Sequence, residues 1–136
     1  MLTIHSLKPG DIVRLNDEGV SREGTVVETN TVQHLAMVHN GIQEFWFRDE
    51  DIQAIPLDEE QLVKFGFIRQ EDNGGVRYLR DSFRVHLPEK GNFSNFEMWW
   101  REDRRHFHHQ LAVHEFQNMY LDMTKVPLNR PELADI

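Results

Sequence analysis

Residues 36–47 read AMVHNGIQEFWF and contain the strongest hairpin signal in the chain. Asn40 and Gly41 both accept the positive φ angles of a type I′ turn, so this pair predicts a tight turn between strands at 36–39 and 42–47. Short runs of apolar or β-branched residues, separated by turn residues, predict further strands on either side. Further strands are expected at residues 12–15, 24–29 and 52–55, and the first strand of the hairpin is expected to begin at Val32.

Five short strands within residues 1–56 predict a small SH3-like β-barrel. A Pro9-Gly10-Asp11 turn opens the strand series, and a short polar break at residues 48–51 precedes the last strand. Both features are typical of that architecture. Because barrels of this kind serve many functions, the predicted fold does not indicate one.

Residues 57–136 predict a second domain, which makes the chain α+β overall. Asp58 is a predicted N-cap for a short helix that ends at Gly66, and the strands that follow predict an antiparallel sheet. A C-terminal amphipathic helix, expected from about Leu111 to Thr124, would pack on that sheet. Gln117 is expected to be solvated. The helix would turn one apolar face inward, made of Ala112, Phe116, Met119, Tyr120 and Met123.

Composition limits the classes of partner. The formal net charge is -8 over 136 residues, which disfavours general binding to nucleic acids or anionic membranes. The absence of cysteine excludes disulfides and thiolate zinc sites. The first residues lack the pattern of a signal peptide, and no apolar run reaches the roughly 20 residues that span a bilayer. We therefore expect a cytoplasmic protein.

Two segments of the chain resemble motifs of a known family. Residues 51–67 read DIQAIPLDEEQLVKFGF, and residues 113–124 read VHEFQNMYLDMT. Together with the Gly10-Asp11-Ile12-Val13 turn, they are similar to small uncharacterised proteins of Bacteroidetes genomes and their phages. The chain departs from that pattern at Gln61, where tryptophan is usual, and at Lys125, where glycine is usual. The resemblance implies a phage or mobile-element context in a bacterial host, and no particular chemistry.

The histidines are the first candidate binding residues. His106 and His108 alternate along a predicted strand and so share a face. His114 lies on the predicted helix, with Asn118 one turn later. Imidazole is a common metal ligand, but no pair of histidines has the spacing of a helical metal site. We therefore expect no metal ion here and keep these four residues as candidate ligand-binding residues.

Aromatic and basic residues supply the other candidates. Trp46 and Trp99 stand next to polar residues, and exposed aromatic rings of this kind contact bases or peptides. Arg104 and Arg105 could meet a phosphate or an acidic partner, although Glu102 and Asp103 interrupt the basic stretch.

No phosphate-binding loop, nucleophile elbow or catalytic triad occurs in the sequence. We therefore expect a non-enzymatic binding or accessory protein, without a cofactor, that acts on a protein partner or a small ligand, and an anti-defence role is one form of this hypothesis. One alternative is a nucleic-acid-associated protein that uses the barrel, although the net charge makes nucleic acid an unlikely partner. Another is a small metal-dependent enzyme that uses the His106–His114 region. The sequence does not indicate the oligomeric state.

Overall fold

The chain folds into two five-stranded antiparallel sheets and a small number of helices, as the computed structural model shows for residues 2–130. The α+β prediction is confirmed at this level. The fold divides into two units: Met1–Ile55 with Ala112–Asn118, and Pro56–Leu111 with Met119–Ile136. Residues 131–136, the end of the predicted second domain, lie outside the described residues. Within the described part, no helix is long and apolar enough to cross a membrane.

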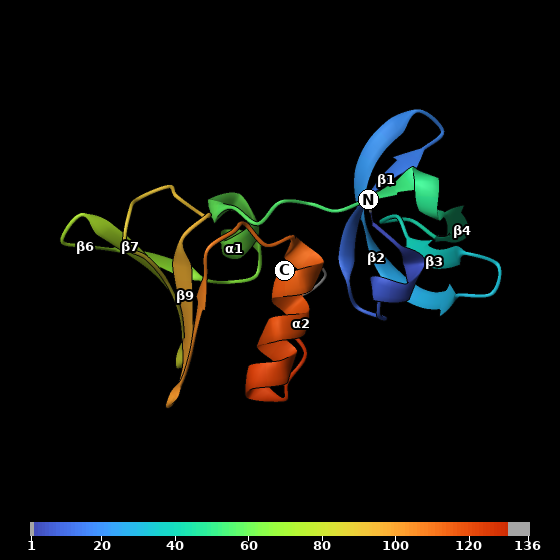
Figure 1. The fold of residues 1–136 in the computed structure, drawn as a ribbon. Coiled ribbons are helices and arrows are strands. Elements are labelled where there is room, and N and C mark those ends of the chain that lie inside the picture. The colour runs from blue at the N-terminus through green and yellow to red at the C-terminus, as the bar shows by residue number, and fades with distance from the viewer. Residues whose placement is uncertain (1, 131–136) are drawn as a thin grey trace. The chain divides into compact units, whose positions relative to one another are not determined.

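The first unit contains a curled sheet with strand order β4-β3-β2-β1-β5 (Figure 1). A short 3-10 helix, Ile4–Ser6, precedes the sheet, and a second one, Asp49–Asp51, leads into the last strand. The strands are β1 (Ile12–Asp17), β2 (Val20–Asn30), β3 (Leu35–His39), β4 (Glu44–Arg48) and β5 (Ile52–Gln53).

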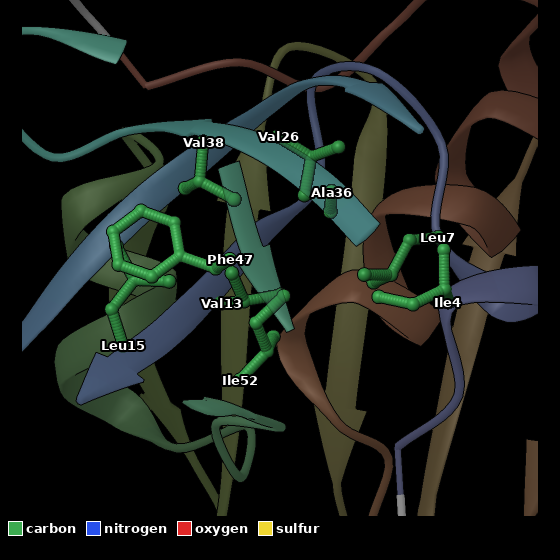
Figure 2. Close-up of a cluster of buried hydrophobic side chains, with 9 residues drawn as sticks. All are labelled: Ile4, Leu7, Val13, Leu15, Val26, Ala36, Val38, Phe47 and Ile52. Carbon is green, nitrogen blue, oxygen red and sulfur yellow. The ribbon is translucent and has the colours of Figure 1, made fainter. Parts of the chain in front are cut away.

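The curl of this sheet encloses an apolar core (Figure 2). Gly24 lies on the long strand β2, close to the side chains of Val38 and Leu15. A Cβ atom there would come within 2.6 Å of Val38 Cγ1 and 2.7 Å of Leu15 Cδ1. A register shift between Val26 and Glu28 adds a β-bulge, which increases local bending. The core side chains are Ile4, Leu7, Val13, Leu15, Val26, Ala36, Val38, Phe47 and Ile52.

The loop at Asn40 and Gly41 differs from the predicted two-residue turn. His39 pairs with Glu44, so four residues connect β3 to β4, and only Gly41 has a positive φ, of 101°. The Asn40 side chain explains the difference, because its Oδ1 accepts the backbone N–H groups of Ile42 and Gln43, each at 3.0 Å. Asparagine acts here as a local hydrogen-bond acceptor and not as a left-handed turn residue.

The second unit begins with the short helix α1 (Glu59–Lys64), whose predicted caps are confirmed. Asp58 Oδ1 accepts the Gln61 N–H at 3.0 Å. At the other end Gly66 has φ 90°, and Phe67 N–H bonds to the Leu62 carbonyl at 3.1 Å, which is a Schellman motif.

The second sheet has the strand order β10-β9-β8-β7-β6, with consecutive strands paired (Figure 1). Asn73 and Gly74 join the first two strands, and their φ angles of 43° and 87° are those of a type I′ turn. The strands are β6 (Ile68–Asp72), β7 (Gly75–Arg80), β8 (Phe83–Leu87), β9 (Phe96–Trp100) and β10 (Asp103–Phe107).

Helix α2 spans Val113–Thr124. Its residues up to Asn118 belong to the first unit, and those from Met119 belong to the second. The expectation that Gln117 is solvated is wrong, because this side chain is only 5% exposed. Gln117 Oε1 accepts the backbone N–H of Ile12 at 2.8 Å, and Nε2 donates to the Gly10 carbonyl at 2.9 Å. A buried side-chain amide thus completes the hydrogen bonding at the start of β1.

Candidate functional site

One face of the second sheet carries two cross-strand rows of polar and aromatic side chains. Successive residues of a strand point to opposite faces, so Val85 and Met98 fill the buried face while their neighbours form the other. The first row runs across β7 to β10 as Leu79, Arg84, Trp99 and Arg104. The second row runs across the same strands as Arg77, His86, Glu97 and His106.

Trp99 lies between two arginines in the first row. The guanidinium carbon of Arg104 is 3.8 Å from the centre of the indole ring, and that of Arg84 is 5.9 Å away. Each such cation–π contact is worth about 0.5–1 kcal/mol at an exposed site. The stacking restrains the Arg104 side chain, whose guanidinium also lies 3.6 Å from Glu97 Oε2.

Glu97 fixes the orientation of this group from the second row. Its Oε2 accepts the indole N–H of Trp99 at 2.6 Å, and the same oxygen lies 3.6 Å from the Arg104 guanidinium. Glu97 Oε1 lies 3.7 Å from Nδ1 of His106. The one carboxylate of the two rows is therefore already engaged with three neighbours.

The arginines border a surface pocket of about 490 Å³. Arg84, Arg101 and Arg104 line it together with Trp99 and Ser82. We call these five residues the arginine pocket. Arg101 stands at the β9–β10 turn with φ 56°, a conformation that disfavours residues with a Cβ by roughly 1–2 kcal/mol. The chain thus keeps an arginine where glycine or asparagine would fit the backbone better.

Charge is unevenly distributed between the units. The ranges of the first unit hold four lysines and arginines against ten aspartates and glutamates, whereas those of the second hold eleven against thirteen. The net charge of -8 therefore comes mostly from the first unit, and the argument against anionic ligands applies weakly to the arginine pocket.

The structure brings four of the eight sequence-predicted residues together. Trp99 and Arg104 belong to the arginine pocket, and His106 lies on the same face. His108 follows as a stacked neighbour, with its ring 4.3 Å from that of His106 and an interplanar angle of 17°. Across residues 2–130, no group of three or more His, Asp or Glu side chains is arranged to hold a metal ion.

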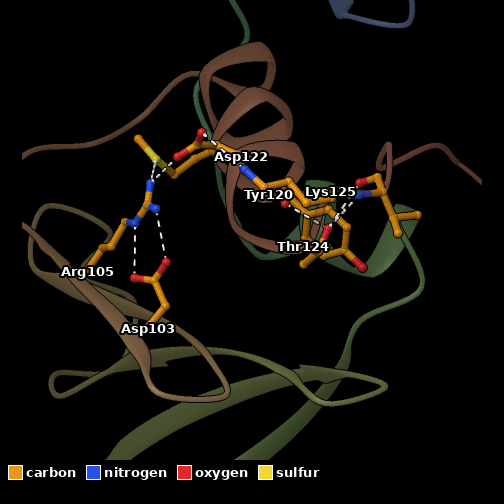
Figure 3. A network of polar contacts seen from close by, with 8 residues as sticks. Asp103, Arg105, Tyr120, Asp122, Thr124 and Lys125 are labelled. Atoms are coloured by element: carbon orange, nitrogen blue, oxygen red, sulfur yellow. Dashed lines mark hydrogen bonds and ion pairs between the residues drawn. The ribbon is translucent and has the colours of Figure 1, made fainter.

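Arg105 points away from this face, because it alternates with Arg104 along β10. Its guanidinium binds Asp103 at 3.0 Å and Asp122 of α2 at 2.7 Å (Figure 3). These carboxylates raise the pKa of Arg105. It also contacts the sulfur of Met119 at 3.0 Å. Arg105 therefore has a full set of partners within its own unit.

Trp46 belongs to the first unit and lies on β4, at the edge of the curled sheet. It is 43% exposed, and its neighbour Phe45 is 44% exposed. The two rings make β4 the most aromatic exposed strand of that sheet.

His114 and Asn118 also belong to the first unit. Asn118 hydrogen-bonds the carboxylate of Asp11, which is 2% exposed. Burial raises the pKa of Asp11 to about 6. Burial lowers the pKa of His114, and the nearby Glu115 partly opposes that shift.

Sequence reasoning missed several residues of these sites. Residues 83–87 alternate between apolar and polar types, and this pattern puts Arg84 opposite the apolar face, so a signal was available in the sequence. Arg101 is part of the basic stretch and Glu97 alternates onto the same face as Trp99, so both were visible in the sequence. Their grouping with Arg84 and Arg104 required the register across β8, β9 and β10. Asp11 was interpreted only as a turn residue.

Comparison with known proteins adds no assignment. No family model, no curated protein and no solved structure matches the chain.

Proposed function

We propose that this chain is a non-enzymatic binding protein whose second unit recognises a small phosphorylated ligand. The observation that carries the proposal is the arginine pocket, in which three guanidinium groups surround one cavity beside an indole ring. Guanidinium groups match phosphate oxygens in charge and in geometry, and each can donate two parallel hydrogen bonds.

The size and lining of the pocket support a small ligand. Its volume of about 490 Å³ falls in the range of small-molecule sites. The indole ring of Trp99 holds the stacked Arg104 side chain in place, and the three arginines supply positive charge. Glu97 does not offset this charge fully, because it is a single carboxylate that already accepts the Trp99 N–H.

We also propose an accessory role in a phage or mobile element inside a bacterial cell, with anti-defence activity as one form of that role. It rests on the resemblance of residues 51–67 and 113–124 to the phage-associated family. We also propose that the first unit is an SH3-like barrel. The strand order β4-β3-β2-β1-β5 and the 3-10 helix before β5 support this assignment.

Calorimetric titration with AMP, adenosine and pyrophosphate tests the ligand class. AMP and adenosine differ by the phosphate alone, and pyrophosphate presents the anion without a base. We expect AMP and pyrophosphate to bind and adenosine to bind at least tenfold more weakly. Equal binding of AMP and adenosine, or no binding of either phosphate compound, would reject the proposal.

Arg104 and Arg105 form a matched pair of variants, because they are neighbours on β10 that point to opposite faces. Removing one charged hydrogen-bond partner costs about 1.5–3 kcal/mol, so Arg104→Gln should weaken binding of pyrophosphate by about tenfold or more. Arg105→Gln should leave the affinity within about twofold. Equal losses in both variants would show that only general charge matters.

Binding of single-stranded nucleic acid is the second candidate, because the rows containing Arg77, Arg84 and Arg104 cross four strands on one face. It ranks lower because Arg104 covers the Trp99 ring on which a base would stack. Titration with an oligonucleotide at increasing salt discriminates the two. Tight binding that falls steeply with salt, combined with weak binding of AMP, would favour nucleic acid.

A further inference from the structure

A second pocket, separate from the arginine pocket, lies within the first unit. Its volume is about 400 Å³, and the first turns of α2 form one wall through His114, Glu115 and Asn118. The hydroxyl-bearing residues Thr3 and Ser6 also line it. We call it the helix pocket. Neither the proposed phosphate site nor its test involves any of these residues.

His114 carries the main observation. The residue is only 5% exposed, and its Nδ1 atom is buried without a hydrogen-bond partner among the described residues. An unpaired buried polar atom costs about 1–3 kcal/mol, so native proteins usually satisfy it with protein, water or a ligand. Because burial lowers the pKa of His114, the ring is neutral near pH 7, and Nδ1 is an acceptor when Nε2 carries the proton.

Asn118 adds a second acceptor. Its side chain bonds the Asp11 carboxylate, and an ionised carboxylate only accepts hydrogen bonds. Asn118 must therefore direct its amide nitrogen to Asp11, which leaves its carbonyl oxygen for another partner. The bond to Asp11 therefore orients the Asn118 amide so that its carbonyl oxygen can accept a hydrogen bond from a ligand in the pocket.

Glu115 and Ser6 also offer hydrogen-bond acceptors to the pocket. Glu115 accepts the Ala112 N–H through Oε1 at 2.8 Å, and its second oxygen is not used in that bond. The Ser6 hydroxyl donates to the Thr3 carbonyl at 2.7 Å, which leaves its oxygen as an acceptor. The helix pocket thus presents acceptors and a negative charge to its contents.

Among the described residues the lining contains no lysine or arginine, and the apolar part of the wall comes from Leu2, Ala54 and Ala112. A buried second carboxylate, Asp11, lies behind Asn118. An anion would meet this negative charge without a compensating cation, whereas an ammonium group would find a carboxylate and several acceptors. The positive end of the helix dipole opposes a cation by roughly 0.5 of a charge, which is less than the full charge of Glu115.

We propose that the helix pocket is a binding site for a small primary amine, with the ammonium group held by Glu115, Asn118 and His114 and a short apolar body against Leu2, Ala54 and Ala112. The amine donates one hydrogen bond to Nδ1 of His114, which gives that atom its partner.

NMR titration of the full chain with n-butylammonium tests the proposal. The probe has one ammonium group and a short apolar body, whereas n-butanol and butyrate have the same body with neutral and negative head groups. We expect n-butylammonium to shift the backbone amides of His114, Glu115 and Asn118 and the imidazole Nδ1 resonance, with saturation in the millimolar range typical of so small a ligand. The two other probes should produce shifts at least tenfold weaker at equal concentration.

Two variants complete the experiment. Glu115→Gln keeps the shape and the acceptor for the Ala112 N–H but removes the charge, and it should weaken n-butylammonium binding by about tenfold. Glu44→Gln removes an exposed carboxylate elsewhere in the first unit and should leave the affinity within about twofold. Equal response to n-butanol, an unmoved Nδ1 resonance, or equal losses in the two variants would each overturn the proposal. Failure here leaves the AMP and adenosine comparison unaffected, since that test reports on the arginine pocket.

Discussion

The side-chain amide of Gln117 is hydrogen-bonded to the backbone of Ile12, with 2.8 Å between Oε1 and the Ile12 nitrogen. The same amide donates to the Gly10 carbonyl, and the next helix residue, Asn118, bonds the Asp11 side chain. The Gly10-Asp11-Ile12 turn and the Gln117-Asn118 pair are distant in sequence, yet they contact each other within the first unit. This contact gives a physical reason for those residue types in both segments.

Gln117→Ala should destabilise the protein by about 2–3 kcal/mol. The substitution leaves a buried N–H and a buried carbonyl without partners, although alanine itself favours a helix. Urea unfolding followed by circular dichroism measures the loss. Gln43→Ala removes an exposed glutamine side chain from the β3–β4 loop and should change the free energy of unfolding by less than about 0.5 kcal/mol. A similar small change in Gln117→Ala would show that water replaces the amide without loss.

This pair of residues shows where sequence reasoning ended. Periodicity located the helix and its apolar face, because Phe116, Tyr120 and Met123 repeat at helical spacing and are buried. It also assigned Gln117 to solvent, because a polar residue off that face is usually exposed. The assignment failed because the helix is enclosed on more than one side. The polar groups it meets at Gly10 and Ile12 come from over a hundred residues away, and local pattern carries no information on them.

The candidate sites were also predicted only in part from local sequence patterns. Alternation along β10 placed His106 on the same face as His108, but Arg104 and Arg105 were treated as one basic stretch although they point to opposite faces. The composition of the arginine pocket required the register of three strands, since Arg84 and Arg104 stack on Trp99 only because all three lie in one cross-strand row. Without the strand pairing, the sequence predicts the face of the sheet on which each residue lies, but not the residues beside it on the neighbouring strands.

Asp11 should make the protein less stable as the pH rises, which is opposite to the usual effect of a carboxyl group. Burial raises its pKa from 3.8 to about 6, so the folded state holds this proton more tightly than the unfolded state. Its contribution to stability is therefore full below about pH 4, decreases as the pH rises to about 6, and is constant above that. His114 acts in the opposite direction. Its pKa is lowered from 6.5, so its contribution is full above pH 6.5 and decreases as the pH falls.

Asp11→Asn isolates the contribution of Asp11 to the pH dependence, because asparagine has the same shape and no charge. Relative to the unsubstituted protein, the variant should gain roughly 2–3 kcal/mol of stability between pH 4 and pH 7. Urea unfolding at pH 4, 5, 6 and 7 measures that difference. Glu44→Gln should show no such trend. A difference that stays constant with pH in Asp11→Asn would mean that Asp11 has the same pKa in both states.

Gly24→Ala should destabilise the curled sheet by about 1–3 kcal/mol. The new methyl group would lie 2.6 Å from Val38 Cγ1 and 2.7 Å from Leu15 Cδ1, so both core side chains must move from their packed positions. Ser21→Ala, at an exposed position of the same strand, should change stability by less than about 0.5 kcal/mol. Thermal unfolding of the three proteins gives the comparison. Equal Tm values for both variants would mean that the sheet opens at Gly24 without loss.

The two Asn-Gly pairs should respond differently to the replacement of asparagine by glycine. Asn73 has a positive φ of 43°, which glycine adopts at no steric cost, so Asn73→Gly should be neutral within about 0.5 kcal/mol. Asn40 instead accepts two backbone N–H groups and donates to Asp17 Oδ2 at 2.9 Å. Asn40→Gly removes these bonds and should cost about 1–2 kcal/mol.

Urea unfolding of the two variants under one set of conditions measures both effects, and each variant is the control for the other. Each substitution adds one glycine to its turn, so the contrast reports the side-chain hydrogen bonds of Asn40 and the left-handed φ of Asn73. Equal losses would show that the turns work alike, and that Asn40 contributes through its backbone and not through its side chain.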